Sequence, residues 1–253
     1  MWSSQLLQVN PRARVTVERV GRAGHRVVLV DDFYAHPDEV VGLAQGLHFF
    51  AGKMHGNFPG ARAIISLDTA PLLATLSELW GAPLEPFQVF QPVVFSAIIN
   101  HPGLTLNNAQ RQPHVDPGVS AMVYLNAPEL CVGGTGLYRH RLTGLERVPA
   151  AVTPDLLEFA AQYGYGPDAL KSQAEYTAFQ DSIVFNPLFA ARENTYINDG
   201  NEFWELMYLV EMRFNRLVIF DGRVPHSQHL KPGQFADHAR LNQIFYLKGP
   251  DAP

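Results

Sequence analysis

The sequence lacks most of the features that mark secreted, membrane or nucleic-acid-binding proteins. Cys131 is its only cysteine, which excludes an intramolecular disulfide bond. It has no run of about 18 apolar residues, as a transmembrane helix requires, and no basic start followed by an apolar core, as in a signal peptide. The net charge of −5 argues against nucleic acid as a partner, because phosphate binding requires a basic surface. We therefore expect a soluble, cytoplasmic protein that binds neither nucleic acid nor membranes.

The composition predicts one globular domain over residues 1–253. Hydrophobic residues make up 47% of the chain and charged residues 17%, which is enough apolar material for a core and unlike a disordered chain. We find no internal repeat, low-complexity tract or long linker that would divide the chain.

Helices are predicted mainly before the strands. Residues 26–30 resemble a buried strand, a helix is expected from Pro37 to about Leu47, and a second helix over 71–80. A further helical stretch is expected over 153–182, with Thr153 as its N-cap. Segments rich in β-branched and aromatic residues predict strands within 87–100, 120–126, 133–141, 203–212, 215–222 and 239–249. This order indicates an α+β, mainly β fold, with helices packed on a β-sandwich or open barrel.

A His-x-Asp pair precedes one of the predicted strands. His114 and Asp116 lie two residues apart, so on an extended backbone their side chains point to the same face. Such a pair can be a hydrogen-bonded surface pair, part of a hydrolytic triad, or two ligands of one metal ion. A third ligand is needed to favour the metal.

His226 is the candidate for that third ligand, since it follows the apolar segment "NRLVIFDG" by a few residues. Two histidines and one carboxylate on one face of an octahedron leave three positions open, an arrangement that suits Fe(II) in oxygen-activating enzymes. His229 is an alternative distal ligand at a similar place in the sequence.

Arg240 opens the last predicted strand, 14 residues beyond His226. Its planar guanidinium suits two-pronged recognition of a carboxylate. The spacing therefore indicates an anionic cosubstrate with one end at the metal and the other at Arg240. The alternative is an ion pair with a nearby carboxylate such as Asp237.

In this order, these motifs resemble the non-haem Fe(II)/2-oxoglutarate-dependent dioxygenases, and among them the prolyl-hydroxylase-like group. The resemblance covers roughly residues 87–250. It rests on four segments: "PHVD" (113–116), "GGTGLY" (133–138), "LVIFDGRVPHS" (217–227) and "RLNQIFYL" (240–247).

The resemblance implies a double-stranded β-helix, or jelly roll, over residues 87–250, with an insertion near 141–200 and a helical support region over 1–86. It also implies that His114, Asp116 and His226 hold Fe(II). His226 is favoured over His229 because it directly follows the matching stretch "FDGRVP".

The resemblance further implies that 2-oxoglutarate chelates the iron and pairs its far carboxylate with Arg240. Tyr124 is a candidate hydrogen-bond partner of that carboxylate, or else a core tyrosine. Asn242 stands where family members often carry serine or threonine, and it retains a hydrogen-bond donor.

The function implied is an O2-dependent hydroxylase acting on a small molecule or on an amino-acid side chain of a peptide or protein. Two alternatives remain open at this point. One is a non-catalytic jelly-roll metal or ligand sensor, and the other is a cupin-like metal enzyme that does not use 2-oxoglutarate.

Overall fold

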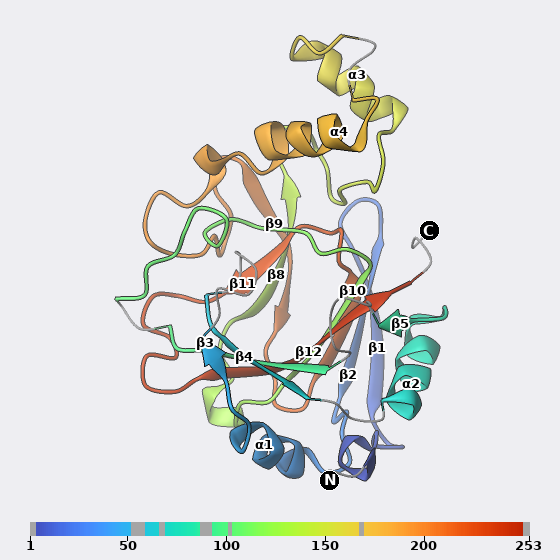
Figure 1. Ribbon diagram of the computed structural model, residues 1–253, viewed down its shortest axis with the longest axis vertical. Coiled ribbons are helices and arrows are strands. Elements are labelled where there is room, and N and C mark those ends of the chain that lie inside the picture. The colour runs from blue at the N-terminus through green and yellow to red at the C-terminus, as the bar shows by residue number, and fades with distance from the viewer. Residues whose placement is uncertain are drawn as a thin grey trace.

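The computed structural model describes residues 4–51, 59–65, 69–86, 93–100, 103–166 and 170–249. The fold is mainly β, with two sheets and four α-helices in the described ranges (Figure 1). Every strand pair in these ranges is antiparallel. The mainly β fold predicted from the sequence is therefore confirmed.

The larger sheet has the order β1-β2-β10-β7-β12-β6-β4-β3, with β5 also paired to β12, and the smaller sheet has the order β11-β8-β9. The strands are β1 (Arg14–Val20), β2 (His25–Asp31), β3 (Phe50–Ala51), β4 (Ala61–Ile65), β5 (Glu85–Pro86), β6 (Val93–Ile98), β7 (Val119–Tyr124), β8 (Gly134–His140), β9 (Trp204–Glu211), β10 (Leu217–Asp221), β11 (His226–His229) and β12 (Arg240–Lys248).

The helices are α1 (Pro37–Gln45), α2 (Ala70–Trp80), α3 (Pro154–Gln162) and α4 (Gln173–Phe179). A π-helical turn, η3 (Gln180–Val184), continues α4, and three short 3-10 helices are η1 (Ser4–Leu7), η2 (Pro128–Leu130) and η4 (Pro187–Phe189). Among the described residues, no helix combines the length and the apolar character needed to cross a bilayer.

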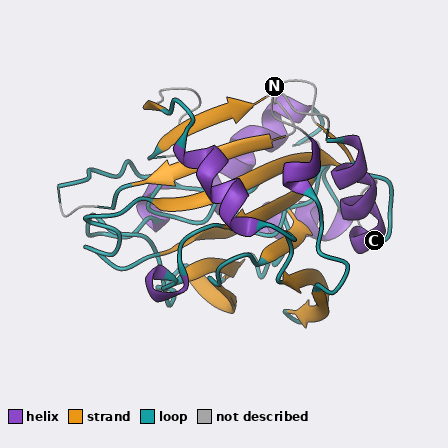
Figure 2. Ribbon diagram, turned by 90° about the horizontal axis from the view of Figure 1, so that it is seen from below, coloured by secondary structure: helices purple, strands orange, loops and turns teal. Residues whose placement is uncertain are grey.

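Helices α1 and α2 cover the outer face of the larger sheet (Figures 1 and 2). Apolar residues of both helices, such as Leu43 and Leu76, pack in one core with alternate residues of the strands, such as Phe95 and Phe245. Each is almost completely buried, so the outer face of the sheet is closed by the helices.

Residues 1–86 were predicted as a helical support region. They do contain α1 and α2, but they also supply strands of the larger sheet. β2 pairs with β10, and β4 pairs with β6, so both ends of the sheet come from the N-terminal third of the chain. β1 was not predicted as a strand. Its Val15 and Val17 side chains are 52% and 44% exposed, as expected on an edge strand that packs little apolar surface.

The inner face of the larger sheet looks toward the smaller sheet. The second core contains Tyr124 and Phe220 from the larger sheet, and Leu137 and Val210 from the smaller sheet. On β12 the even-numbered residues from Arg240 to Tyr246 share this inner face, since side chains alternate along a strand. The inner face carries the polar residues described below.

The predicted helical stretch 153–182 contains two helices rather than one. α3 begins at the N-cap Thr153, whose hydroxyl accepts the Leu156 N–H, and Gly164 follows its end with a φ of 84°. α4 then begins with a capping box between Ser172 and Glu175. Both helices lie at one end of the molecule, at the top of Figure 1.

Candidate metal centre

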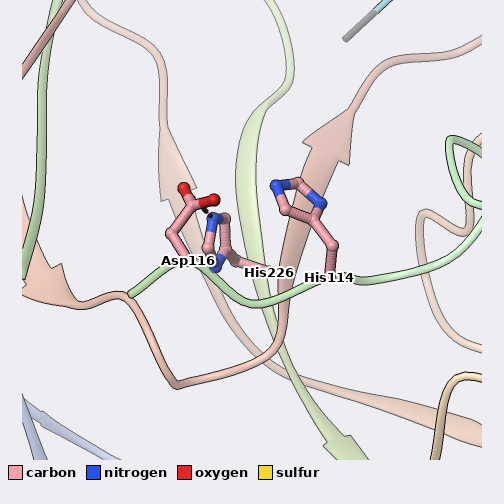
Figure 3. Close-up of side chains that lie close together, drawn as sticks. All are labelled: His114, Asp116 and His226. Carbon is pink, nitrogen blue, oxygen red and sulfur yellow. Dashed lines mark ion pairs between the residues drawn. The ribbon is translucent and has the colours of Figure 1, made fainter. Parts of the chain in front are cut away.

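The structure brings His114, Asp116 and His226 together. One ligand atom of each lies within 4.8 Å of the others, and within the described ranges this is the only such group of three or more His, Cys, Asp or Glu residues. The imidazole rings of the two histidines are 4.4 Å apart, and His226 Nε2 lies 3.4 Å from Asp116 Oδ2. Figure 3 shows the three side chains around one space.

Backbone hydrogen bonds place these ligands. His114 and His226 exchange both of their backbone hydrogen bonds, at 2.9 and 2.8 Å, and so form one antiparallel bridge. The Asp116 N–H donates to the Gly222 carbonyl oxygen at 2.8 Å. A side chain at Gly222 would lie 2.8 Å from the Asp116 carbonyl oxygen, so this close approach requires glycine.

The tautomer of His226 is fixed by a neighbouring carbonyl. His226 Nδ1 lies 2.9 Å from the Val224 carbonyl oxygen, which can only accept, so Nδ1 carries the proton. Nε2 is then left with a lone pair that faces Asp116. This is the usual arrangement of a metal-binding histidine, whose second nitrogen donates to a carbonyl or carboxylate.

The protonation states also suit metal binding. Burial, and then the neighbouring His226, lower the pKa of His114 to about 4, so its imidazole is neutral at pH 7. Burial alone would raise the pKa of Asp116, but the neighbouring His226 and the charge of Arg62 lower it to about 2. The Asp116 carboxylate is therefore ionised at neutral pH.

The donor set fits a 2-His-1-carboxylate site. Two neutral imidazole nitrogens and one carboxylate oxygen suit Fe(II) and leave coordination positions open. His226 is buried, whereas the Asp116 side chain is 26% exposed, so a ligand can approach the metal position from the Asp116 side.

Arg240 is a buried cation without a carboxylate partner in the described part of the chain. Only 3% of its surface is exposed, and burial lowers the pKa of its guanidinium. Its Nη1 and Nη2 donate to Gln228 Oε1 and to the Gly134 carbonyl oxygen, at 3.3 and 3.2 Å, and its Nε has no partner. It does not form the alternative ion pair with Asp237. A buried cation that lacks a counter-ion is costly, so this site favours an anionic ligand.

Gln228 links Arg240 to the metal position. His226 and Gln228 are both on β11, two residues apart on one face, which corresponds to about 6.6 Å along the strand. Arg240 Nη1 donates to Gln228 Oε1 at 3.3 Å. The guanidinium therefore contacts a residue on the same face of β11 as the candidate ligand His226.

Asn242 and Tyr124 lie beside Arg240 on the inner face. With its amide oriented to satisfy its neighbours, Asn242 accepts a hydrogen bond from Arg240 Nη1 at 2.8 Å. Arg240 lies over the Tyr124 ring, 5.7 Å from its centroid, and the Tyr124 hydroxyl lies 2.8 Å from Thr135 Oγ1. Tyr124 thus contacts Arg240 through its ring while its hydroxyl bonds to Thr135. A direct bond from Tyr124 to a cosubstrate stays a prediction.

His229 lies apart from the three candidate ligands. It ends β11, and its Nε2 lies 3.3 Å from Asp199 Oδ1, on the side of the chain segment that follows α4 and η4. The geometry therefore favours His226 over His229 as the distal ligand.

Two polar residues near Arg240 were not predicted from the sequence. The hydroxyls of Ser96 and Tyr196 are buried and have no hydrogen-bond partner among the described residues. Ser96 lies opposite Asn242 in the β6–β12 register. Burial raises the pKa of Tyr196 to about 12, and the charge of Arg240 opposes that shift, which places Tyr196 near the guanidinium. Both hydroxyls are available to a ligand that binds Arg240.

Comparison with known proteins assigns the chain to a family. No curated protein matches the sequence. Among solved structures, the chain is similar to the non-heme alpha ketoglutarate dependent carbocyclase SnoK from nogalamycin biosynthesis, with 13% identity, a TM-score of 0.38, and coverage of 88% of this chain and 79% of that one. Residues 11–176 and 169–241 match the model of a family of unknown function, DUF6445. The chain therefore belongs to the DUF6445 family.

Proposed function

We propose that this protein is an Fe(II)- and 2-oxoglutarate-dependent oxygenase. One observation carries the proposal: a 2-His-1-carboxylate cluster lies near a buried arginine that has no carboxylate partner in the described residues. Gln228, two residues from the candidate ligand His226 on β11, accepts a hydrogen bond from this arginine. The two sheets facing each other across this cluster suit a double-stranded β-helix of the prolyl-hydroxylase-like group. The reaction proposed is hydroxylation of a small molecule or of an amino-acid side chain in a peptide or protein.

In this proposal, His114, Asp116 and His226 hold the metal. Bound Fe(II), with 2-oxoglutarate as the electron donor, supplies the activation of O2 that oxidises the substrate. The carbonyl of Val224 keeps the proton on Nδ1 of His226, so that Nε2 stays available as a ligand. Ser120 donates a hydrogen bond to Asp116 Oδ2 at 3.4 Å and so restrains the carboxylate.

Arg240 orients the cosubstrate by binding its far carboxylate. The Tyr124 ring and Gln228 hold the guanidinium from two sides, so that it is preorganised before the ligand arrives. The hydroxyls of Ser96 and Tyr196, which lack partners in the described part of the chain, are suitable further donors to the same carboxylate.

Metal-dependent stabilisation by 2-oxoglutarate tests this function. With Mn(II) bound under argon, 2-oxoglutarate at 100 times its Kd stabilises the native state by about 2.7 kcal/mol. In a domain of this size we therefore expect the Tm to rise by roughly 5–10 °C.

Glutarate is the matched control, because it offers the same far carboxylate but no 2-oxo group to chelate the metal. We expect it to raise the Tm much less, and the effect of 2-oxoglutarate to fall when Mn(II) is removed. An unchanged Tm with 2-oxoglutarate, in protein that demonstrably holds Mn(II), would contradict the function and favour a metal site of another kind.

A further inference from the structure

A second arginine lies near the metal position, on a different strand from Arg240. Arg62 is on β4 and is half-buried. Its Nη2 donates to the Tyr246 hydroxyl at 3.1 Å, and its guanidinium lies 5.8 Å from the centre of the Tyr246 ring. Arg62 and Tyr246 therefore form one unit that joins β4 to β12 across β6.

This unit faces the same interior space as the candidate ligands. In the β4–β6 and β6–β12 registers Arg62 lies opposite Ser96, which in turn lies opposite Asn242 on the inner face. Tyr246 lies opposite Ser120 in the β12–β7 register, and the Ser120 hydroxyl bonds to Asp116. Only Ser120 therefore stands between Tyr246 and the candidate ligand Asp116 in this series of contacts.

Electrostatics places Arg62 close to the metal position as well. Arg62 is close enough to His114 and Asp116 for its charge to act on both, and Asp116 is likewise close to Tyr246. Arg240, in contrast, acts on Tyr124 and Tyr196. The two arginines therefore act on different parts of the site.

The two arginines come from different strands, Arg240 from β12 and Arg62 from β4, with β6 between them. The Arg62 guanidinium lies against Tyr246, six residues beyond Arg240 on β12. The charges of Fe(II), Asp116, the 2-oxoglutarate dianion and Arg240 sum to zero. The metal and its cosubstrate therefore do not themselves require a second arginine beside Asp116.

We propose that Arg62, supported by Tyr246, binds a carboxylate group of the substrate and holds the substrate beside the metal. The inference rests on the proposed function, which it deepens by naming the substrate class as organic carboxylates. Arginine suits this role because its planar donors match a carboxylate, and the Tyr246 ring and hydroxyl restrict its orientation.

Fluoroacetate and fluoroacetamide are suitable probes, because they differ in charge but hardly in size. Protein loaded with Mn(II) and saturated with 2-oxoglutarate is titrated with each probe, and the paramagnetic enhancement of 19F relaxation is measured. We expect strong enhancement for fluoroacetate and little for fluoroacetamide. The enhancement for fluoroacetate should persist when 2-oxoglutarate is raised tenfold, since the two anions occupy different positions.

The variants Arg62→Gln and Arg14→Gln each remove one positive charge. Comparing them separates a direct effect of Arg62 on fluoroacetate binding from an effect of the net charge of the protein. Arg14 is on the edge strand β1, and its side chain is 72% exposed. We expect Arg62→Gln to weaken fluoroacetate binding by roughly tenfold or more, as for loss of a charged hydrogen bond. Arg14→Gln should leave it unchanged, and Arg62→Lys should restore part of it.

Binding of Mn(II) and of 2-oxoglutarate is measured on the same samples by calorimetry. If both bind but fluoroacetate shows no enhancement, or shows the same enhancement in Arg62→Gln, the role of Arg62 is refuted while the proposed function stands. If Mn(II) binds and 2-oxoglutarate does not, the proposed function fails and this inference fails with it.

Discussion

Replacing His226 with alanine is expected to weaken Fe(II) or Mn(II) binding at least about 100-fold. Loss of a residue that merely hydrogen-bonds to a metal ligand already costs up to about 100-fold in affinity, and here a ligand itself is lost. His226 is the one candidate ligand from β11, whereas His114 and Asp116 come from a single short segment. Without it, two ligands from that segment would hold the metal alone. Anaerobic titration calorimetry measures the loss.

The matched control is His229→Ala, at the other end of the same short strand. Its imidazole pairs with Asp199 rather than with the candidate ligands, so metal affinity should change by less than about threefold, a factor within ordinary mutational scatter. Because His226 is buried, His226→Gln is measured beside His226→Ala, and the Tm of each metal-free variant shows that it is folded. Strong metal binding by both His226 variants, with loss in His229→Ala, would assign the distal ligand to His229.

Replacing Arg240 with methionine is expected to abolish the stabilisation by 2-oxoglutarate and yet leave metal binding intact. Loss of one partner of a buried charge pair typically costs 2–5 kcal/mol of binding, or roughly 30- to 5,000-fold in Kd. Without ligand, Arg240→Met is expected to stabilise the protein, because methionine removes a buried charge that has no counter-ion among the described residues. A gain of about 1 kcal/mol would raise the Tm by roughly 2–4 °C.

Arg216 provides the contrast, since it is also buried but is paired with a carboxylate. Its Nε and Nη2 donate to the two oxygens of Asp31 at 2.5 and 2.9 Å. Arg216→Met should therefore lower the Tm. The loss in free energy of unfolding should be less than the roughly 3–5 kcal/mol of a fully buried pair, because the Asp31 side chain is 24% exposed. If Arg240→Met also lowered the Tm of the ligand-free protein and retained 2-oxoglutarate binding, Arg240 would be a structural residue.

Local patterns in the sequence, together with the family resemblance, were sufficient to name the three candidate ligands. The two-residue spacing of His114 and Asp116 places both side chains on one face wherever the backbone is extended. His226 follows the five buried residues of β10 after a short turn, so the sequence could place it near the end of a core strand. Likewise, Pro37 and Thr153 indicated helix starts because proline and capping residues act on the first turn alone.

The remaining features depend on strand register, which no local pattern specifies. Arg62 and Tyr246 are 184 residues apart and meet only because β4 and β12 both pair with β6. Ser96 and Tyr196 became candidate site residues because their buried hydroxyls have no hydrogen-bond partner within the described ranges, which only a structure shows. β1, in contrast, had a usable signal, because "RVTVERV" alternates valine with polar residues as an edge strand does.

The most direct test of the proposed oxygenase is the visible absorption of anaerobic protein with Fe(II) and 2-oxoglutarate. Chelation of Fe(II) by the 2-oxo acid produces a weak charge-transfer band, and the geometry of His114, Asp116, His226 and Arg240 predicts this band in the unmodified protein. The band should be absent in His226→Ala and should require much more 2-oxoglutarate in Arg240→Met. Bound iron without any band at saturating 2-oxoglutarate would contradict cosubstrate chelation at this site.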